Sequence, residues 1–269
     1  LKEKKKRRVN KQSYSHDIHS TEQLENIIKN KIIEWDGGDS RGSSMHQLHE
    51  THNYVMALSS DYYDNYEKWI KVGWALFNTH EDLFYTWMLF SSQSEKFCYE
   101  DIPKYYADWK KMKKHCKNMK LTHKSIMFWL RSENYDKWKE LFEKTCDYWL
   151  ESAMKSRGSH YPIAVLMKKK FGDKSVCANI EKRLWYEFSN HRWKKNDGAY
   201  GLRNKISTEI VQLCTEKATY YGKKRAQASA ASAAGEAEVS PMDSYADSMS
   251  RCAQLSTNLK SCSFNIVYF

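Results

Sequence analysis

Basic and aromatic side chains that could bind a polyanion are concentrated between residues 182 and 205. Trp193 lies directly between two of the basic residues, and the basic set is Lys182, Arg183, Arg192, Lys194, Lys195, Arg203 and Lys205. Lysine and arginine contact phosphates without reading the base sequence, and the resulting binding depends strongly on salt. An aromatic ring beside them can stack on a base. This combination favours nucleic-acid binding without base-specific readout.

A second basic stretch covers residues 104–120, which contain seven lysines and a single acidic residue, Asp108. The candidate phosphate contacts in it are Lys110, Lys111, Lys113, Lys114 and Lys117. The end of a helix and the loop after it would concentrate this charge. Two interpretations stay open, a phosphate-binding surface and a solvated helix face without a ligand.

The whole sequence is basic, with 44 Lys and Arg against 33 Asp and Glu and a formal net charge of +11. Nucleic acid and acidic membrane are the common partners of such a surface. No signal peptide is recognisable, and no apolar run is long enough to span a bilayer. We therefore expect nucleic acid and no membrane. The seven cysteines form no CxxC pair, which favours a reduced intracellular protein over a disulfide scaffold.

Recognisable catalytic motifs are missing from the sequence. Residues 172–175 (Gly-Asp-Lys-Ser) imitate the end of a phosphate-binding P-loop but lack its glycine spacing. Residues 36–39 (Asp-Gly-Gly-Asp) are the closest approach to paired metal-binding acids, and a glycine-rich surface turn explains them better. We therefore expect no catalytic residue and no cofactor in this segment.

Histidines recur every three residues at His46, His49 and His52, so in a helix they form a loose ridge. A metal site and a solvated histidine-rich face are both compatible with this spacing, and the solvated face is the preferred interpretation. His115 and Cys116 are adjacent and would point to different faces of a helix. No metal ligand is assigned.

Helical periodicity dominates residues 46–156. Tyr66, Trp69, Ile70, Gly73 and Phe77 fall on one stripe of a helix that ends at Asn78-Thr79. Thr79 is predicted to cap the next helix together with Asp82, and Thr122 to cap a later one. Strand alternation is not seen here. The pattern predicts a helical bundle.

The pattern changes after residue 157. A helix is expected over residues 161–171, with Gly172 as its C-cap. Residues 184–188 (Leu-Trp-Tyr-Glu-Phe) alternate as a strand, residues 189–191 can turn, and residues 192–194 return as a second strand. A helix resumes at about Leu202. The predicted fold class is mainly α, a helical bundle followed by a small helix–β-hairpin–helix domain whose hairpin must pack on helices.

Five segments follow from composition and pattern. They are a basic, partly flexible N-terminal segment (1–45), the helical domain (46–156), the helix–hairpin–helix domain (157–222), a low-complexity linker rich in alanine and serine (223–244) and a final helix (245–269). The basic run within residues 2–11 is either a DNA-contacting arm or, as we slightly prefer, a solvated linker.

Two stretches resemble domains of known proteins. Residues 68–79 (KWIKVGWALFNT), with Trp87, residues 90–91, residues 94–97 and residues 108–109, resemble the primase C-terminal helical domain of the second type. Residues 176–177, 184–188, 190–193, Asp197 and 202–207 resemble the domain that precedes the ATPase in poxvirus-type and giant-virus primase-helicases. Together they cover roughly residues 46–220, in the order that this family has.

The resemblance implies a parent protein with an archaeo-eukaryotic primase domain upstream and a superfamily 3 helicase downstream. Such helicases form hexameric rings that use ATP and Mg²⁺ during viral DNA replication in the host cytoplasm. This chain would be the non-catalytic middle segment, contacting single-stranded or forked DNA. Its further partners would be the primase and ATPase domains of the same chain and other copies in the ring, with the final helix leading into the ATPase domain. The alternative is an oligomerisation scaffold without direct DNA contact.

Overall fold

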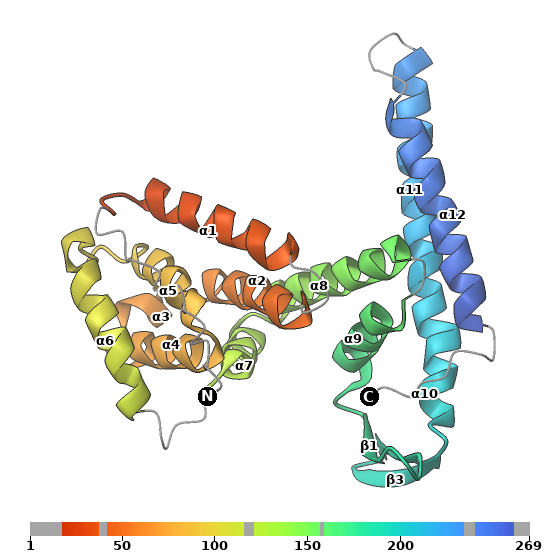
Figure 1. The fold of residues 1–269 in the computed structure, drawn as a ribbon, viewed down its shortest axis with the longest axis horizontal. Helices are drawn as coiled ribbons and strands as arrows, with labels where there is room; N and C mark the ends of the chain where they lie inside the picture. Colours follow the sequence, from red (N-terminus) through yellow and green to blue (C-terminus); the bar gives the residue numbers. More distant parts are fainter. Residues whose placement is uncertain (1–17, 38–41, 116–120, 157–158, 234–239, 261–269) are drawn as a thin grey trace, which may run out of the picture. The chain divides into compact units, whose positions relative to one another are not determined.

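The computed structural model describes residues 18–37, 42–115, 121–156, 159–233 and 240–260. It is mainly helical with one small antiparallel sheet, which confirms the predicted fold class. The chain divides into two compact units, Leu1–Leu141 and Phe142–Phe269, each of which is described by itself (Figure 1). None of the helices in the described ranges is long and apolar enough to cross a membrane.

The first unit is a helical bundle, as predicted. Its elements are α1 (Thr21–Gly37), α2 (Gly42–Met56), α3 (Asp61–Asp64), α4 (Tyr66–Thr79), the 3-10 turn η1 (Glu81–Leu83), α5 (Phe84–Ser91), the 3-10 turn η2 (Tyr99–Asp101), α6 (Ile102–His115), α7 (His123–Glu133) and the start of α8 (Tyr135–Lys155). Helix α1 packs against α2 and α5, and α4 packs against α5, α6 and α7.

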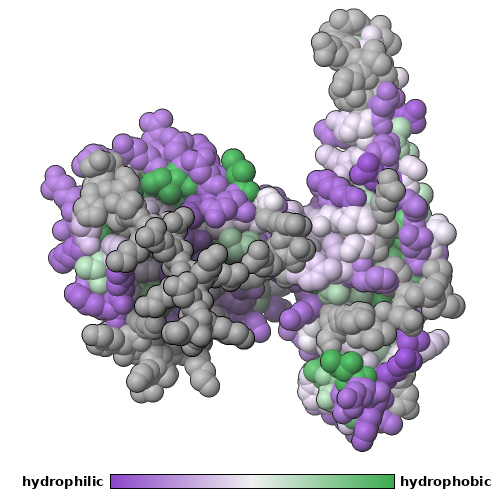
Figure 2. All heavy atoms as spheres, viewed as in Figure 1, coloured by the Kyte–Doolittle hydropathy of each residue, from purple (hydrophilic) through white to green (hydrophobic). Residues whose placement is uncertain are grey.

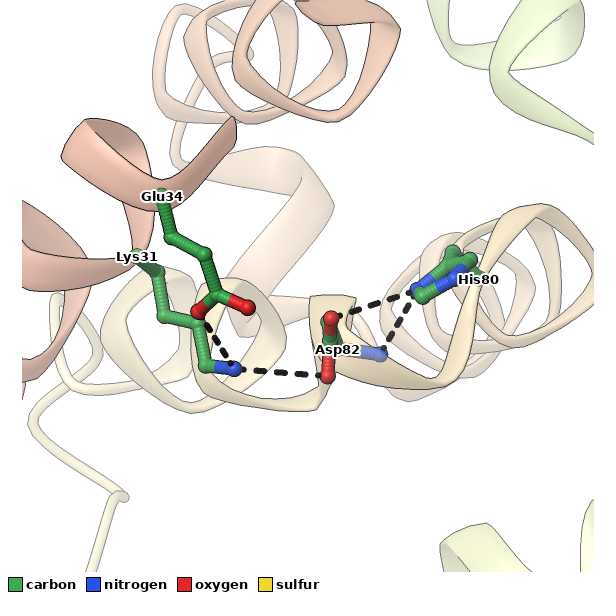
Figure 3. Close-up of polar contacts among 4 residues, drawn as sticks. All are labelled: Lys31, Glu34, His80 and Asp82. Carbon is green, nitrogen blue, oxygen red and sulfur yellow. Dashed lines mark hydrogen bonds and ion pairs between the residues drawn. The ribbon is translucent and has the colours of Figure 1, made fainter. Parts of the chain in front are cut away.

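The N-terminal segment is better packed than its sequence suggested. Helix α1 buries Leu24, Ile28 and Trp35 along one stripe, so residues 21–37 pack on the rest of the unit. The basic run lies outside the described residues. Lys31 of α1 approaches Asp82 of η1 at 3.5 Å and its own neighbour Glu34 at 3.3 Å, which ties the helix to the rest of the unit (Figure 3).

The centre of the first unit is a cluster of aromatic rings carried by α4, α5 and α6. Trp69 stacks on Trp87 with ring centroids 4.6 Å apart, and Trp87 lies 5.5 Å from Trp109. Gly73 makes this stacking possible, because a Cβ atom at that position would lie 2.8 Å from the Trp87 ring. The stripe predicted from the sequence therefore packs through Trp69 and Gly73, whereas Tyr66 at its start is 70% exposed.

The junction between α4 and α5 differs from the predicted capping arrangement. The Thr79 hydroxyl donates to the Ala75 carbonyl at 2.7 Å and does not cap the next helix. The ring of His80 does so instead, accepting from the backbone N–H of Asp82 at 3.2 Å (Figure 3). The other predicted cap is confirmed, because Thr122 precedes α7 in a reciprocal capping box with Ser125.

The second unit combines helices with a three-stranded antiparallel sheet of order β1-β2-β3. Its elements are the end of α8, α9 (His160–Phe171), β1 (Ser175–Asn179), β2 (Leu184–Ser189), β3 (Arg192–Asp197), α10 (Tyr200–Lys205), the π-helical turn η3 (Ile206–Ile210), α11 (Val211–Ala233) and α12 (Ser240–Lys260). The predicted hairpin is β2 and β3, whereas β1 was missed.

The β2–β3 turn explains why this hairpin is tight. Asn190 and His191 are its two central residues and both have positive φ angles, 51° and 60°. A two-residue turn with positive φ at both positions matches the twist of the flanking strands. Gly172 is the C-cap of α9, as predicted, although it stays in the right-handed helical region with φ −60°.

Two of the expected segment boundaries need correction. Helix α11 continues to Ala233, so residues 223–233 are helix and not linker, because alanine is the strongest helix former. Helix α12 runs beside α11 as an antiparallel partner (Figure 1).

The boundary between the units lies within α8 and not after it. The second half of α8 contributes Trp149, Leu150 and Met154 to the core of the second unit.

Candidate nucleic-acid interface

The register of β2 and β3 decides which predicted contact residues share a face of the sheet. Phe188 is paired with Trp193 and Tyr186 with Lys195. Side chains of paired residues point to the same face, and successive residues of a strand point to opposite faces. Trp193 and Lys195 therefore lie on one face together with Tyr186 and Phe188, which we call the outer face.

The outer face carries exposed aromatic rings. Trp193 is 48% exposed and Phe188 is 40% exposed, and their ring centroids are 5.3 Å apart. Val176 of β1, paired with Tyr186, extends the face and is 44% exposed. Figure 2 shows apolar residues beside strongly polar ones at the end of the second unit that holds the sheet. A ring surface with an exposed lysine can stack bases and attract phosphates.

The opposite face of the sheet is the inner face, and it packs on the helices. Trp185 is 6% exposed within the core. Gly201 of α10 lies so close that a Cβ atom there would be 2.5 Å from Glu187 Oε2. Glu187 also accepts from Asn196 Nδ2 at 3.0 Å and from Lys205 Nζ at 2.6 Å. Predicted contact residue Lys205 is thus held in an ion pair that joins α10 to the sheet.

The predicted cluster around Trp193 is divided by the pleat of the strand. Lys194 is paired with Glu187, and Arg192 with Ser189, so both belong to the inner-face side, although both side chains are exposed. The structure therefore brings Trp193 and Lys195 together and separates them from Arg192 and Lys194. The outer-face partners Tyr186 and Phe188 were not among the predicted contacts, although their alternation along β2 is the signal that could have identified them.

The remaining basic residues of this unit flank the sheet. Lys182 and Arg183 are exposed in the β1–β2 connection, where the backbone N–H of Lys182 donates to Asn179 Oδ1 at 2.8 Å. This connection lies at the other end of β2 from the Asn190-His191 turn, about 17–20 Å away for a strand of six residues. Arg203 is exposed on α10.

The lysine stretch of the first unit lies on α6. The Lys110 ammonium is 4.2 Å from the centroid of the Tyr106 ring, and Lys111 is paired with Asp108 at 3.1 Å. The side chains of Lys113 and Lys114 and all of Lys117 lie outside the described residues. The two predicted basic clusters belong to different units.

Comparison with known proteins supports the resemblance found in the sequence. Residues 51–129 match the family model "Primase C terminal 2 (PriCT-2)", a range that contains the aromatic cluster of the first unit. "Putative helicase L207/L206" of Acanthamoeba polyphaga mimivirus is 32% identical over 165 residues, or 61% of this chain. The chain therefore resembles viral primase-helicases.

A second relative supports the same resemblance. "Putative helicase 022R" of Frog virus 3 is 22% identical over 170 residues, again 61% of this chain. The matched part corresponds to 16% of the length of each of these relatives. The segment described here is thus similar to a small part of much longer proteins, and the resemblance to viral primase-helicases that was noted from its motifs is confirmed.

Proposed function

We propose that this primase-helicase segment is a non-catalytic connecting part of a viral replication protein, and that it contacts single-stranded DNA through the outer face of its sheet. The primase domain and the superfamily 3 ATPase ring of the parent would supply the chemistry, with ATP and Mg²⁺. The parent would work at viral replication sites in the host cytoplasm. The relatives named as helicases and the PriCT-2 match support the setting.

The observation that carries the proposal is the outer face itself. Trp193 and Phe188 are large apolar rings in contact with each other and exposed to solvent, and Lys195 lies on the same face. Stacking on such rings tolerates any base, and lysine attracts the phosphate backbone. Forked DNA, which also contains single strands, would meet the same surface.

Binding of the chain to a fluorescent oligothymidylate tests this proposal. Trp193→Ala should weaken binding roughly 5- to 150-fold, because stacking of one base contributes about 1–3 kcal/mol. Affinity should also fall steeply as salt rises. Equal affinity of Trp193→Ala and the wild-type chain would contradict the proposal.

Two adjacent lysines provide a matched pair of variants. Lys194 and Lys195 are both exposed and differ in the face of the sheet to which they belong. Lys195→Gln should reduce the slope of log affinity against log salt by about 0.7, the value for one phosphate contact on a single strand. Lys194→Gln should change the slope less. If Lys194→Gln changed the slope more than Lys195→Gln, the DNA would contact the inner-face side of the hairpin instead.

A scaffold role is the second candidate, favoured by the apolar character of the same surface. Val176, Phe188 and Trp193 are each at least 40% exposed, and exposed apolar groups of this kind also form contacts between subunits. Sedimentation of the chain without DNA separates the two functions. A concentration-dependent oligomer that Trp193→Ala dissociates, together with no DNA affinity, would support the scaffold.

A further inference from the structure

A cluster of metal-binding side chains joins α1 to α2 in the first unit, on residues that the proposed function does not use. Asp36 lies in the last turn of α1, and His46 and His49 lie one helical turn apart on α2. The Nδ1 atom of His46 is 2.9 Å from one oxygen of the Asp36 carboxylate, and the Nδ1 atom of His49 is 2.9 Å from the other. The predicted solvated histidine face is wrong for His46, which is 5% exposed.

The geometry of this cluster is close to that of a cation site. One ligand atom from each of the three residues can be chosen so that all lie within 4.8 Å of one another. Ligands of a tetrahedral zinc ion at about 2.0–2.1 Å from the metal are about 3.3 Å apart. The two histidine–aspartate distances of 2.9 Å would each need to widen by about 0.4 Å, which side-chain rotation can supply.

The electrostatics of the cluster also favour a cation. Both imidazoles face the Asp36 carboxylate, which supplies negative charge at the point where the three ligand atoms converge. The Glu50 carboxylate is 7% exposed and acts on His46, adding negative charge behind the site. Among the residues that the structure describes, Asp36 forms ion pairs with these two histidines, and no lysine or arginine competes for its oxygens.

One side of the cluster is open to solvent. The side chain of His46 is 6% exposed, whereas those of His49 and Asp36 are 24% and 30% exposed. An ion can therefore enter from the side of His49 and Asp36. Three protein ligands with one accessible position is the arrangement of zinc sites that keep a bound water.

We propose that Asp36, His46 and His49 bind one divalent transition-metal ion of the zinc class, with a fourth position open to water. On binding, the metal replaces the hydrogen atoms that the two imidazoles share with Asp36. For an imidazole that is neutral beforehand, the hydrogen moves from Nδ1 to Nε2 and no net proton is released. The ion would cross-link α1 to α2, and the proposal does not depend on DNA binding by the second unit.

Titration of the metal-free chain with Zn²⁺, followed by calorimetry and by thermal unfolding, tests the site. One ion should bind per chain and raise the unfolding temperature of the first unit by several degrees, because a ligand specific to the folded state stabilises it. Asp36→Asn and His49→Gln keep polar groups in place while removing one ligand each. Either should weaken binding roughly 100-fold or more, since loss of an outer-shell partner alone costs about 10–100-fold.

Controls distinguish this site from the other possible ligands of the chain. His19→Gln removes an exposed histidine elsewhere in the first unit and should leave Zn²⁺ affinity unchanged. The absorption spectrum of the Co²⁺-loaded wild-type chain should show the bands of a tetrahedrally coordinated ion. It should contain no thiolate charge-transfer band. A thiolate band would overturn the assignment. So would a Zn²⁺ affinity that neither ligand variant changes, or the absence of saturable Zn²⁺ binding by the wild-type chain.

Discussion

Gly73 has no side chain, and the Trp87 ring occupies the space where one would be. Gly73→Ala should lower the free energy of unfolding of the first unit by about 1–3 kcal/mol, the usual cost of overpacking a core. The gain in helix propensity, about 1 kcal/mol, offsets part of this loss. Denaturant unfolding followed by tryptophan fluorescence measures the difference.

Gly37 supplies the control for that experiment. It also lies in a helix, and a Cβ atom there would meet nothing within 4 Å. Gly37→Ala should therefore leave stability unchanged or raise it slightly. If both alanine variants were equally stable, close contact with Trp87 would not be the reason for glycine at position 73.

His52 makes the stability of the first unit depend on pH. Its ring is buried and bonded to the Thr86 hydroxyl at 3.1 Å, and burial lowers its pKa from 6.5 to about 4. Between these values the unfolded chain binds more protons than the folded one, so stability falls as pH falls through 6.5 and levels off below about 4. The loss attributable to His52 is on the order of 3 kcal/mol.

The measurement for His52 is the free energy of unfolding at pH 7 and pH 5, in the presence of a chelator. His52→Gln should show a smaller difference between the two pH values than the wild-type chain, whereas His19→Gln should show the wild-type difference. An unchanged pH dependence in His52→Gln would mean that the ring is accessible to protons in the folded state.

At the residue scale, the sequence identified the histidine ridge but not its surroundings. A spacing of three places His46, His49 and His52 along one side of a helix. It does not say that Asp36 of α1 and Thr86 of α5 lie opposite, because those contacts depend on how the helices pack. The aromatic stripe of α4 was easier to predict, because large aromatic residues at helical spacing usually pack in a core.

The left-handed turn between β2 and β3 gives a test at the scale of an element. His191 has a φ of 60°, a conformation that β-branched residues adopt at a cost of about 1–2 kcal/mol. His191→Val should destabilise the sheet by that amount, and hydrogen exchange of β2 and β3 amides should become faster. Lys194→Val, at a paired strand position, should not have this effect.

Local pattern predicted some elements well and others poorly. The alternating aromatic residues of β2 identified the hairpin, but β1 is short and reads Ser-Val-Cys-Ala-Asn, with few residues that favour strands. The alanine-rich end of α11 was read as linker because its composition is simple, although alanine favours helix. The basic cluster around Trp193 was treated as one surface, whereas the alternation of a strand divides it between two faces.

At the scale of the whole molecule, the separate cores predict separate unfolding transitions. Leu166 is fully buried in the core of the second unit, and Leu166→Ala should cost about 2–5 kcal/mol there. Gly73→Ala should act on the first unit alone. Calorimetry combined with hydrogen exchange of α4 and α9 peptides would assign each effect, and a common shift of both units in either variant would contradict independent cores.

The π-helical turn η3 connects α10 to α11 with a wider turn than the α-helices on either side. A turn of this kind holds one extra residue, and one residue more or less in a helix rotates everything after it by about 100° and shifts it by about 1.5 Å. Homologous chains that lack the extra residue would therefore turn a different stripe of α11 toward α12. Single-residue gaps near positions 206–210 in an alignment would mark lineages in which α11 presents a different face to α12.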